Sequence, residues 1–146
     1  MLVRPTVTAI ALLVSASGFS TTAVASGWAD LIGRTVVAPM GQSRTSGRNF
    51  ESRMYFARDA KLFWYDDRDA TKGVVVDLVT REVRQLDLPT ESHVEIDAFG
   101  IAVSYSSQGY TQSFKLGFGP PCSVQLTNVF GDTYRSKACY VRDGKY

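Results

Sequence analysis

The side chains that could carry out chemistry in this sequence are few and widely spaced. His93 is the one histidine, and Glu95 and Asp97 follow it at alternate positions of an extended segment. A histidine beside carboxylates is a set that a small hydrolase could use for general acid–base catalysis. No serine stands in the strand–turn–helix context that would make it a nucleophile, so the sequence favours a surface histidine over a catalytic one.

Three carboxylates, Asp66, Asp67 and Asp69, form the densest acidic cluster in the sequence. Calcium binds oxygen ligands of this kind, but its loop needs a glycine at the sixth position and a glutamate at the twelfth. Counted from Asp67, those positions hold Lys72 and Leu78. We therefore expect a solvated turn, with no metal and no cofactor.

The two cysteines, Cys122 and Cys139, are the remaining reactive groups. In an oxidising compartment such a pair is by default a disulfide, and we assign it no catalytic role. The two positions are symmetric about a Phe130–Gly131 loop, which predicts a hairpin with the cysteines face to face. In that register Arg135 lies opposite Leu126, so neither face of the hairpin is purely apolar.

Aromatic residues gather between positions 50 and 65 and divide into two sets. One set alternates on a single face of two strands and is predicted to be core: Phe50, Met54, Phe56, Leu62 and Trp64. The opposite parity places Tyr55, Phe63 and Tyr65 together on the other face. This second set either covers the first helical segment or forms an exposed binding face. We take Tyr55, Phe63 and Tyr65 as the candidate binding face.

Residues 1–25 have the organisation of a cleavable signal peptide. Arg4 supplies a positive start, residues 6–14 are apolar, and Ala23-Val24-Ala25 ends a small, polar segment. The apolar run is about half of the roughly 20 residues that a membrane-spanning helix needs. We therefore expect cleavage after the Ala-Val-Ala motif, a mature domain of residues 26–146 without a transmembrane segment, and a secreted or periplasmic location.

The mature chain has the pattern of short β-strands from Arg34 onward. Val94, Ile96 and Ala98 share one face of such a strand, and turn signals rich in Gly, Pro, Asp and Ser separate about nine runs of this kind. One short helical segment, residues 28–33, precedes them. The sequence predicts an all-β, single-domain antiparallel meander of about eight or nine strands, closed as a small barrel or packed as a sandwich.

Charge and composition narrow the range of partners. The chain carries 16 basic and 14 acidic residues, interspersed, and the net charge of +2 falls by the single unit of Arg4 on cleavage. This leaves no single-signed surface to propose for nucleic acid. Hydrophobic residues make up 45% of the chain, which is enough to fill the interior of a small sheet protein or to line a site for one small apolar ligand.

Two resemblances accompany these patterns. The segment from Cys122-Ser123-Val124-Gln125 through Cys139-Tyr140-Val141 to Gly144 resembles the ending of short secreted bacterial proteins of unassigned function. That resemblance implies export and a disulfide, and no activity. The meander with a leading helix is similar in architecture to lipocalin-like barrels, although Ser26-Gly27-Trp28 departs from their Gly-x-Trp signature.

These features predict a non-enzymatic binding or interaction module that works outside the cytoplasm. Its partner would be a protein of unknown identity or a small apolar ligand, and an inhibitor that presents a loop to an enzyme is one specific form. Two alternatives stay open: a small carboxylate-dependent hydrolase built on His93 with Glu95 or Asp97, and a structural protein of the cell envelope.

Overall fold

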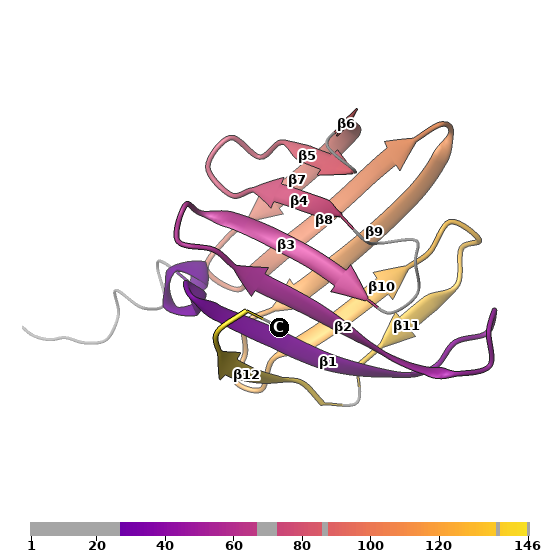
Figure 1. The fold of residues 1–146 in the computed structure, drawn as a ribbon, viewed down its shortest axis with the longest axis horizontal. Coiled ribbons are helices and arrows are strands. Elements are labelled where there is room, and N and C mark those ends of the chain that lie inside the picture. Colours follow the sequence, from indigo (N-terminus) through magenta and orange to yellow (C-terminus); the bar gives the residue numbers. More distant parts are fainter. Residues whose placement is uncertain (1–26, 67–72, 86–87, 137, 146) are drawn as a thin grey trace, which may run out of the picture.

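The computed structural model describes residues 27–66, 73–85, 88–136 and 138–145. The expected signal peptide, and Asp67 and Asp69 of the acidic turn, lie outside the described residues. Two antiparallel sheets face each other, and their strands cross at a steep angle (Figure 1). The all-β prediction is therefore confirmed.

The first sheet has seven strands in the order β12-β1-β2-β3-β4-β5-β6. Their bounds are β1 (Arg34–Gln42), β2 (Asn49–Phe56), β3 (Lys61–Asp66), β4 (Val74–Asp77), β5 (Val83–Gln85), β6 (Leu88–Pro89) and β12 (Tyr140–Asp143). Strands β1 to β6 pair in chain order, as a meander should. Strand β12 returns from the far end of the described chain to pair with β1.

The second sheet has five strands in the order β11-β10-β9-β8-β7. Their bounds are β7 (Glu91–Ile96), β8 (Gly100–Ser107), β9 (Tyr110–Gly117), β10 (Ser123–Thr127) and β11 (Thr133–Arg135). Among the described strands, β12 and β6 are the edges of one sheet and β11 and β7 the edges of the other. The barrel is thus not closed, and the sandwich alternative describes the fold.

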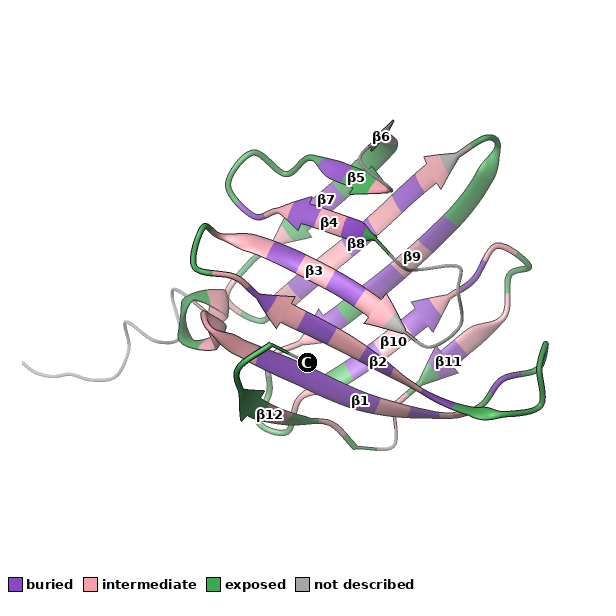
Figure 2. Cartoon of the chain, in the orientation of Figure 1, coloured by how far each residue is buried: buried purple, intermediate pink, exposed green. Residues whose placement is uncertain are grey.

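The core lies between the sheets and follows the alternation of the strands (Figure 2). The aromatic set assigned to the core is buried as expected, and so are the inward-facing residues of the second sheet: Val94, Ile101, Val103, Tyr105, Phe114 and Leu116. Trp64 joins the two layers, because its ring centroid lies 4.4 Å from that of Phe114 in the other sheet. Within its own sheet, Trp64 Nε1–H donates to Ser52 Oγ of β2 at 2.8 Å.

The predicted N-terminal helix is a 3-10 helix, η1 (Gly27–Leu31). It packs against the core through Trp28, Leu31 and Ile32. The chain then joins the first sheet, where Gly33 N–H donates to Phe56 O at 2.6 Å. The helix therefore covers part of the core.

The register predicted for the β10–β11 hairpin is wrong by one residue. Leu126 pairs with Tyr134, and Arg135 pairs with Gln125. The loop comprises residues 128–132 rather than two residues, because Asn128 N–H donates to Asp132 O at 3.0 Å. A slip of one residue moves every side chain to the other face, so Tyr134 is buried in the core and Arg135 is exposed. This removes the mixed face that the symmetric register implied.

The disulfide between Cys122 and Cys139 is confirmed, with a Cα–Cα distance of 5.7 Å. It does not join two paired positions of one hairpin, as the sequence suggested. Cys122 immediately precedes β10 of the five-stranded sheet, and Cys139 immediately precedes β12 of the seven-stranded sheet. The bridge therefore fastens the chain where it crosses from one sheet to the other.

The turn after β4 depends on the carboxylate of Asp77. Its Oδ1 accepts the backbone N–H groups of Val79 and Thr80, both at 2.9 Å, and Lys61 Nζ lies 3.6 Å from Oδ2. The N–H of Thr80, then that of Val79, lower the pKa of Asp77 below its ordinary value of 3.8. Burial opposes them, and the Lys61 charge adds a smaller lowering of the pKa. The ionised carboxylate therefore stabilises the turn.

We expect Asp77→Asn to lower the free energy of unfolding at pH 7 by about 1 kcal/mol, because hydrogen bonds to a charged acceptor are stronger than to a neutral one. A depressed folded-state pKa stabilises the fold fully above the unfolded-state pKa and loses this effect as the pH falls through the folded-state pKa. Urea unfolding from pH 7 to pH 2 should therefore show the difference between the two proteins shrinking at the acid end. Asp59→Asn, on an exposed carboxylate near the same lysine, is the matched control; an equal loss there would contradict this role.

Candidate functional site

The side of the seven-stranded sheet that faces away from the core carries a row of aligned side chains. Most of them are partly or largely exposed, but Thr35 is fully buried and donates its Oγ1–H to Gly144 O. Cross-strand register aligns one residue from each of six adjacent strands, in the order Arg142, Thr35, Tyr55, Phe63, Val75 and Arg84. Such neighbours lie about 5 Å apart, close enough to act as one surface. We call this surface the outer face; a parallel row adds Arg53 opposite Tyr65.

The three aromatic residues assigned to a binding face lie together on the outer face. Tyr55 and Phe63 are direct cross-strand partners, with ring centroids 6.3 Å apart and planes inclined by 34°. Tyr65 follows two positions further along β3. All three are half-buried, which leaves part of each ring open to solvent.

The segment after β12 runs along the edge of this aromatic pair. Gly144 N–H donates to Gly33 O at 2.9 Å, and Thr35 Oγ1 donates to Gly144 O at 2.6 Å. These bonds direct residues 144 and 145 across β1, in front of the sheet (Figure 1). Lys145 Nζ then lies 6.0 Å from the Tyr55 ring and 5.6 Å from the Phe63 ring. A cation over these rings shows that the aromatic pair accepts positive charge from above.

Basic side chains flank the aromatic pair. Arg53 Nη2 is 2.7 Å from Glu51 Oε1, which neutralises one of them. Arg84 is exposed, and within the described residues it forms no hydrogen bond or ion pair. Arg142 stands at the opposite end of the row. The outer face thus combines flat rings with guanidinium groups.

The residues of the hydrolase alternative lie on the solvent side of the five-stranded sheet. His93 Nε2 is 2.9 Å from Glu95 Oε2, and these side chains are 74% and 72% exposed. Asp97 serves the next turn, where Oδ1 accepts the N–H groups of Phe99 at 2.7 Å and Gly100 at 3.0 Å. Both side chains of this pair are therefore largely surrounded by solvent.

A shallow depression of about 170 Å³ adjoins His93. Its lining includes Ser104, Ser113 and Lys115. Within the described residues His93 makes no hydrogen bond to a serine, so the pairing of base and nucleophile that covalent hydrolysis needs is not assembled. This geometry gives the hydrolase alternative no support.

A third site, which the sequence analysis did not single out, lies between the sheets at the end where β8 turns into β9. It is an open pocket of about 340 Å³ lined by Gln85, Gln108, Tyr110, Gln112, Val129 and Phe130. The lining comes from both sheets, because Gln85 belongs to β5 and the other residues to β9 and to two turns. The sequence does carry one signal for it: Gln112 occupies an inward position of β9, where the alternation calls for an apolar residue. We call this site the end pocket.

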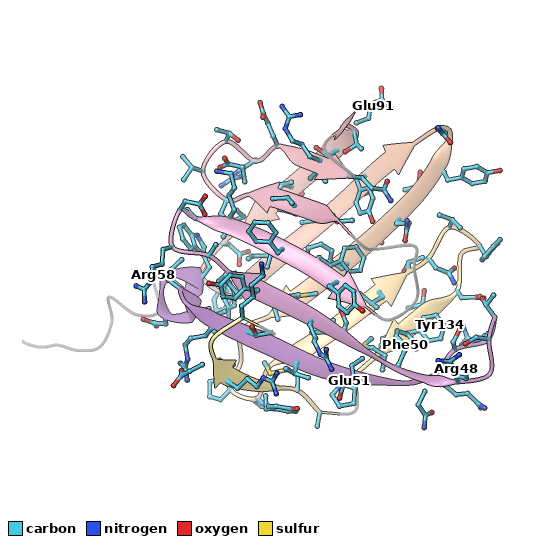
Figure 3. The ribbon with its side chains drawn as sticks, in the orientation of Figure 1. Arg48, Phe50, Glu51, Arg58, Glu91 and Tyr134 are labelled. Atoms are coloured by element: carbon cyan, nitrogen blue, oxygen red, sulfur yellow. A yellow bond between two sulfur atoms is a disulfide. The ribbon has the colours of Figure 1, made fainter. Side chains whose placement is uncertain are left out.

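Within the described ranges no group of three or more His, Cys, Asp and Glu residues could hold a metal ion. No helix among the described residues is long and apolar enough to cross a membrane. Near the β1–β2 turn, Phe50 packs against Tyr134 of the other sheet. Their ring centroids are 5.2 Å apart in an edge-to-face arrangement (Figure 3).

Comparison of the chain with protein-family models, with curated proteins and with solved structures found no match.

Proposed function

We propose that this chain is an exported, non-enzymatic binding module that holds acidic glycan chains on its outer face. The observation that carries the proposal is the single row in which Tyr55 and Phe63 stand between Arg142 and Arg84. These side chains are not needed for the core, which the opposite side of the same strands supplies.

Each part of the row suits one part of an acidic sugar. The apolar C–H face of a pyranose ring packs against an aromatic ring. Tyr55 and Phe63 are half-buried rings of this kind, and Lys145 Nζ beside them adds a positive charge for an acidic sugar. A guanidinium group binds a carboxylate through two parallel hydrogen bonds. Because neighbouring strands lie about 5 Å apart, these contacts lie along one line that an extended sugar chain can follow.

Export is supported from two directions. Residues 1–25 have the signal-peptide pattern given above, and the Cys122–Cys139 disulfide is of a kind that persists in oxidising compartments outside the cytoplasm. The same disulfide makes the module suited to an environment in which polysaccharides are found.

The test is affinity electrophoresis of residues 26–146 in gels containing polygalacturonate, with dextran gels as the neutral reference. We expect the protein to be retarded by polygalacturonate and not by dextran, and the retardation to weaken with salt. Phe63→Ser and Arg84→Gln should each weaken binding by about tenfold, the effect of losing one good contact.

Arg135→Gln is the matched control for charge. Arg135 is exposed on β11 of the other sheet, so this variant loses the same unit of charge away from the outer face. Its retardation should equal that of the unmodified protein. Equal weakening by Arg135→Gln and Arg84→Gln would show that only net charge matters, and the absence of any retardation would overturn the proposal.

A further inference from the structure

The end pocket lies where the inward-facing residues change from apolar to carboxamide. On β9, Phe114 and Leu116 are buried in the core, and the inward position before them is Gln112, only 6% exposed. On β5, Val83 is buried and Gln85 holds the next inward position. Burying an amide is unfavourable compared with burying a side chain such as Leu, so packing alone does not account for two glutamines at this end.

The turn between β8 and β9 forms one wall of the pocket. Gln108 and Gly109 both have positive φ, 56° and 85°. Two successive residues with positive φ form the two-residue turn that matches the twist of hairpin strands. Asparagine is the residue normally found at the first position, and glutamine adopts this conformation less readily. The longer side chain of Gln108 lines the pocket, where asparagine would stop one methylene short.

The turn between β10 and β11 forms the opposite wall. Asn128 Oδ1 accepts the backbone N–H groups of Phe130 at 3.0 Å and Asp132 at 2.9 Å, which fixes the turn. Phe130 is nevertheless 74% exposed, and Tyr110 across the pocket is 63% exposed. Two large aromatic side chains, Tyr110 at the start of β9 and Phe130 in the β10–β11 turn, thus line the pocket and stay largely exposed.

The lining defines the chemistry of a ligand. Each of Gln85, Gln108 and Gln112 offers a carbonyl acceptor and an N–H donor, the combination that adjacent sugar hydroxyl groups require. Among the described residues, the lining contains no Lys, Arg, Asp or Glu, which disfavours a charged ligand. The volume of about 340 Å³ falls within the range of small-molecule sites.

We infer that the end pocket binds one or two residues of a neutral saccharide. The three carboxamides bond the hydroxyl groups, and Tyr110 and Phe130 pack against the C–H faces of the sugar ring at the mouth. This site is separate from the outer face, and the inference does not depend on the acidic glycan proposed there.

The experiment is an NMR titration of ¹⁵N-labelled residues 26–146 with cellohexaose, maltohexaose and xylohexaose, each at millimolar concentration. The reporters are the side-chain NH₂ signals of Gln85, Gln108 and Gln112 and the backbone signals of Gly109 and Gly131. We expect at least one saccharide to shift these signals in a saturable way. A hexapeptide of glycine and serine at the same concentration should leave them in place.

Matched variants then locate the site. Phe130→Ala and Gln112→Leu should weaken saccharide binding by at least tenfold, and Gln108→Asn, which retains the turn, should weaken it as well. Phe99→Ala removes a phenylalanine that is 78% exposed on another hairpin turn, and Phe63→Ser alters the outer face; both should bind as the unmodified protein does.

Three outcomes would overturn the inference. They are shifts from none of the three saccharides, shifts that persist in both Phe130→Ala and Gln112→Leu, and shifts caused by the peptide but by no sugar. Loss of saccharide binding in Phe63→Ser with retention in Phe130→Ala would instead assign the sugar to the outer face.

Discussion

Replacing Trp64 with alanine is expected to lower the free energy of unfolding by about 3–5 kcal/mol, the largest effect of any single side chain. Trp64 is 1% exposed, and its ring contacts Phe114 at 4.4 Å and Tyr105 at 6.1 Å. Both partners belong to the opposite sheet, so the substitution opens a cavity between the two layers. It also removes the N–H donor to Ser52 Oγ at 2.8 Å.

Urea unfolding followed by far-UV circular dichroism measures this loss. Trp64→Phe retains a ring and loses the indole N–H, and it should cost only about 1–3 kcal/mol, which keeps the prediction testable if the alanine variant does not fold. Tyr65→Ala is the matched control, because the adjacent side chain points to the outer face. A loss from Tyr65→Ala as large as that from Trp64→Ala would contradict this account of the core.

Removal of the disulfide is the second large effect that we expect. The double substitution Cys122→Ala/Cys139→Ala should lower the free energy of unfolding by about 3 kcal/mol, the chain-entropy value for a loop of this length. The bridged residues are 17 positions apart and lie at the entries to β10 and β12. Without the bridge, β12 is held by its pairing with β1 and by the ion pair between Arg34 and Asp143.

Guanidinium unfolding with and without dithiothreitol measures the effect in the parent protein. Reductant should destabilise the parent by a similar amount and leave the double variant unchanged, which separates the bridge from any effect of the reductant itself. Hydrogen exchange adds a local readout, since amides of β12 should lose protection before those of β9. A double variant as stable as the oxidised parent would show that the disulfide contributes nothing to the free energy of unfolding.

Much of the fold could be predicted from the sequence, because strand alternation is a local property. The parity of Ile101, Val103 and Tyr105 separates core from solvent in the same way as burial does. The hairpin register could not be predicted from cysteine symmetry, since a disulfide needs close Cβ atoms and not paired strand positions. The chain meets that need by crossing between sheets after Arg135, a choice made by tertiary packing.

The candidate sites also differ in how much of each could be predicted from the sequence. The shared face of Tyr55 and Phe63 follows from counting along two neighbouring strands. Arg142 joins that face only because β12 returns to β1, and this pairing spans 107 positions of sequence between Thr35 and Arg142. The end pocket brings Gln85 of one sheet beside Gln112 of the other, and no pattern along a single strand reveals such a meeting.

The edge strands of the two sheets determine how readily one molecule can pair with another at high concentration. The unpaired backbone of an edge strand is a template for another molecule, and short or charged edges suppress that pairing. Three of the edges here are strands of two to four residues, β6, β11 and β12. The fourth, β7, carries Glu91, His93 and Glu95, and Glu91 stands at the margin of the fold (Figure 3). The nine-residue β1 is kept inside the sheet by β12. Among the described strands, the exposed sheet edges are therefore poor templates for pairing between molecules.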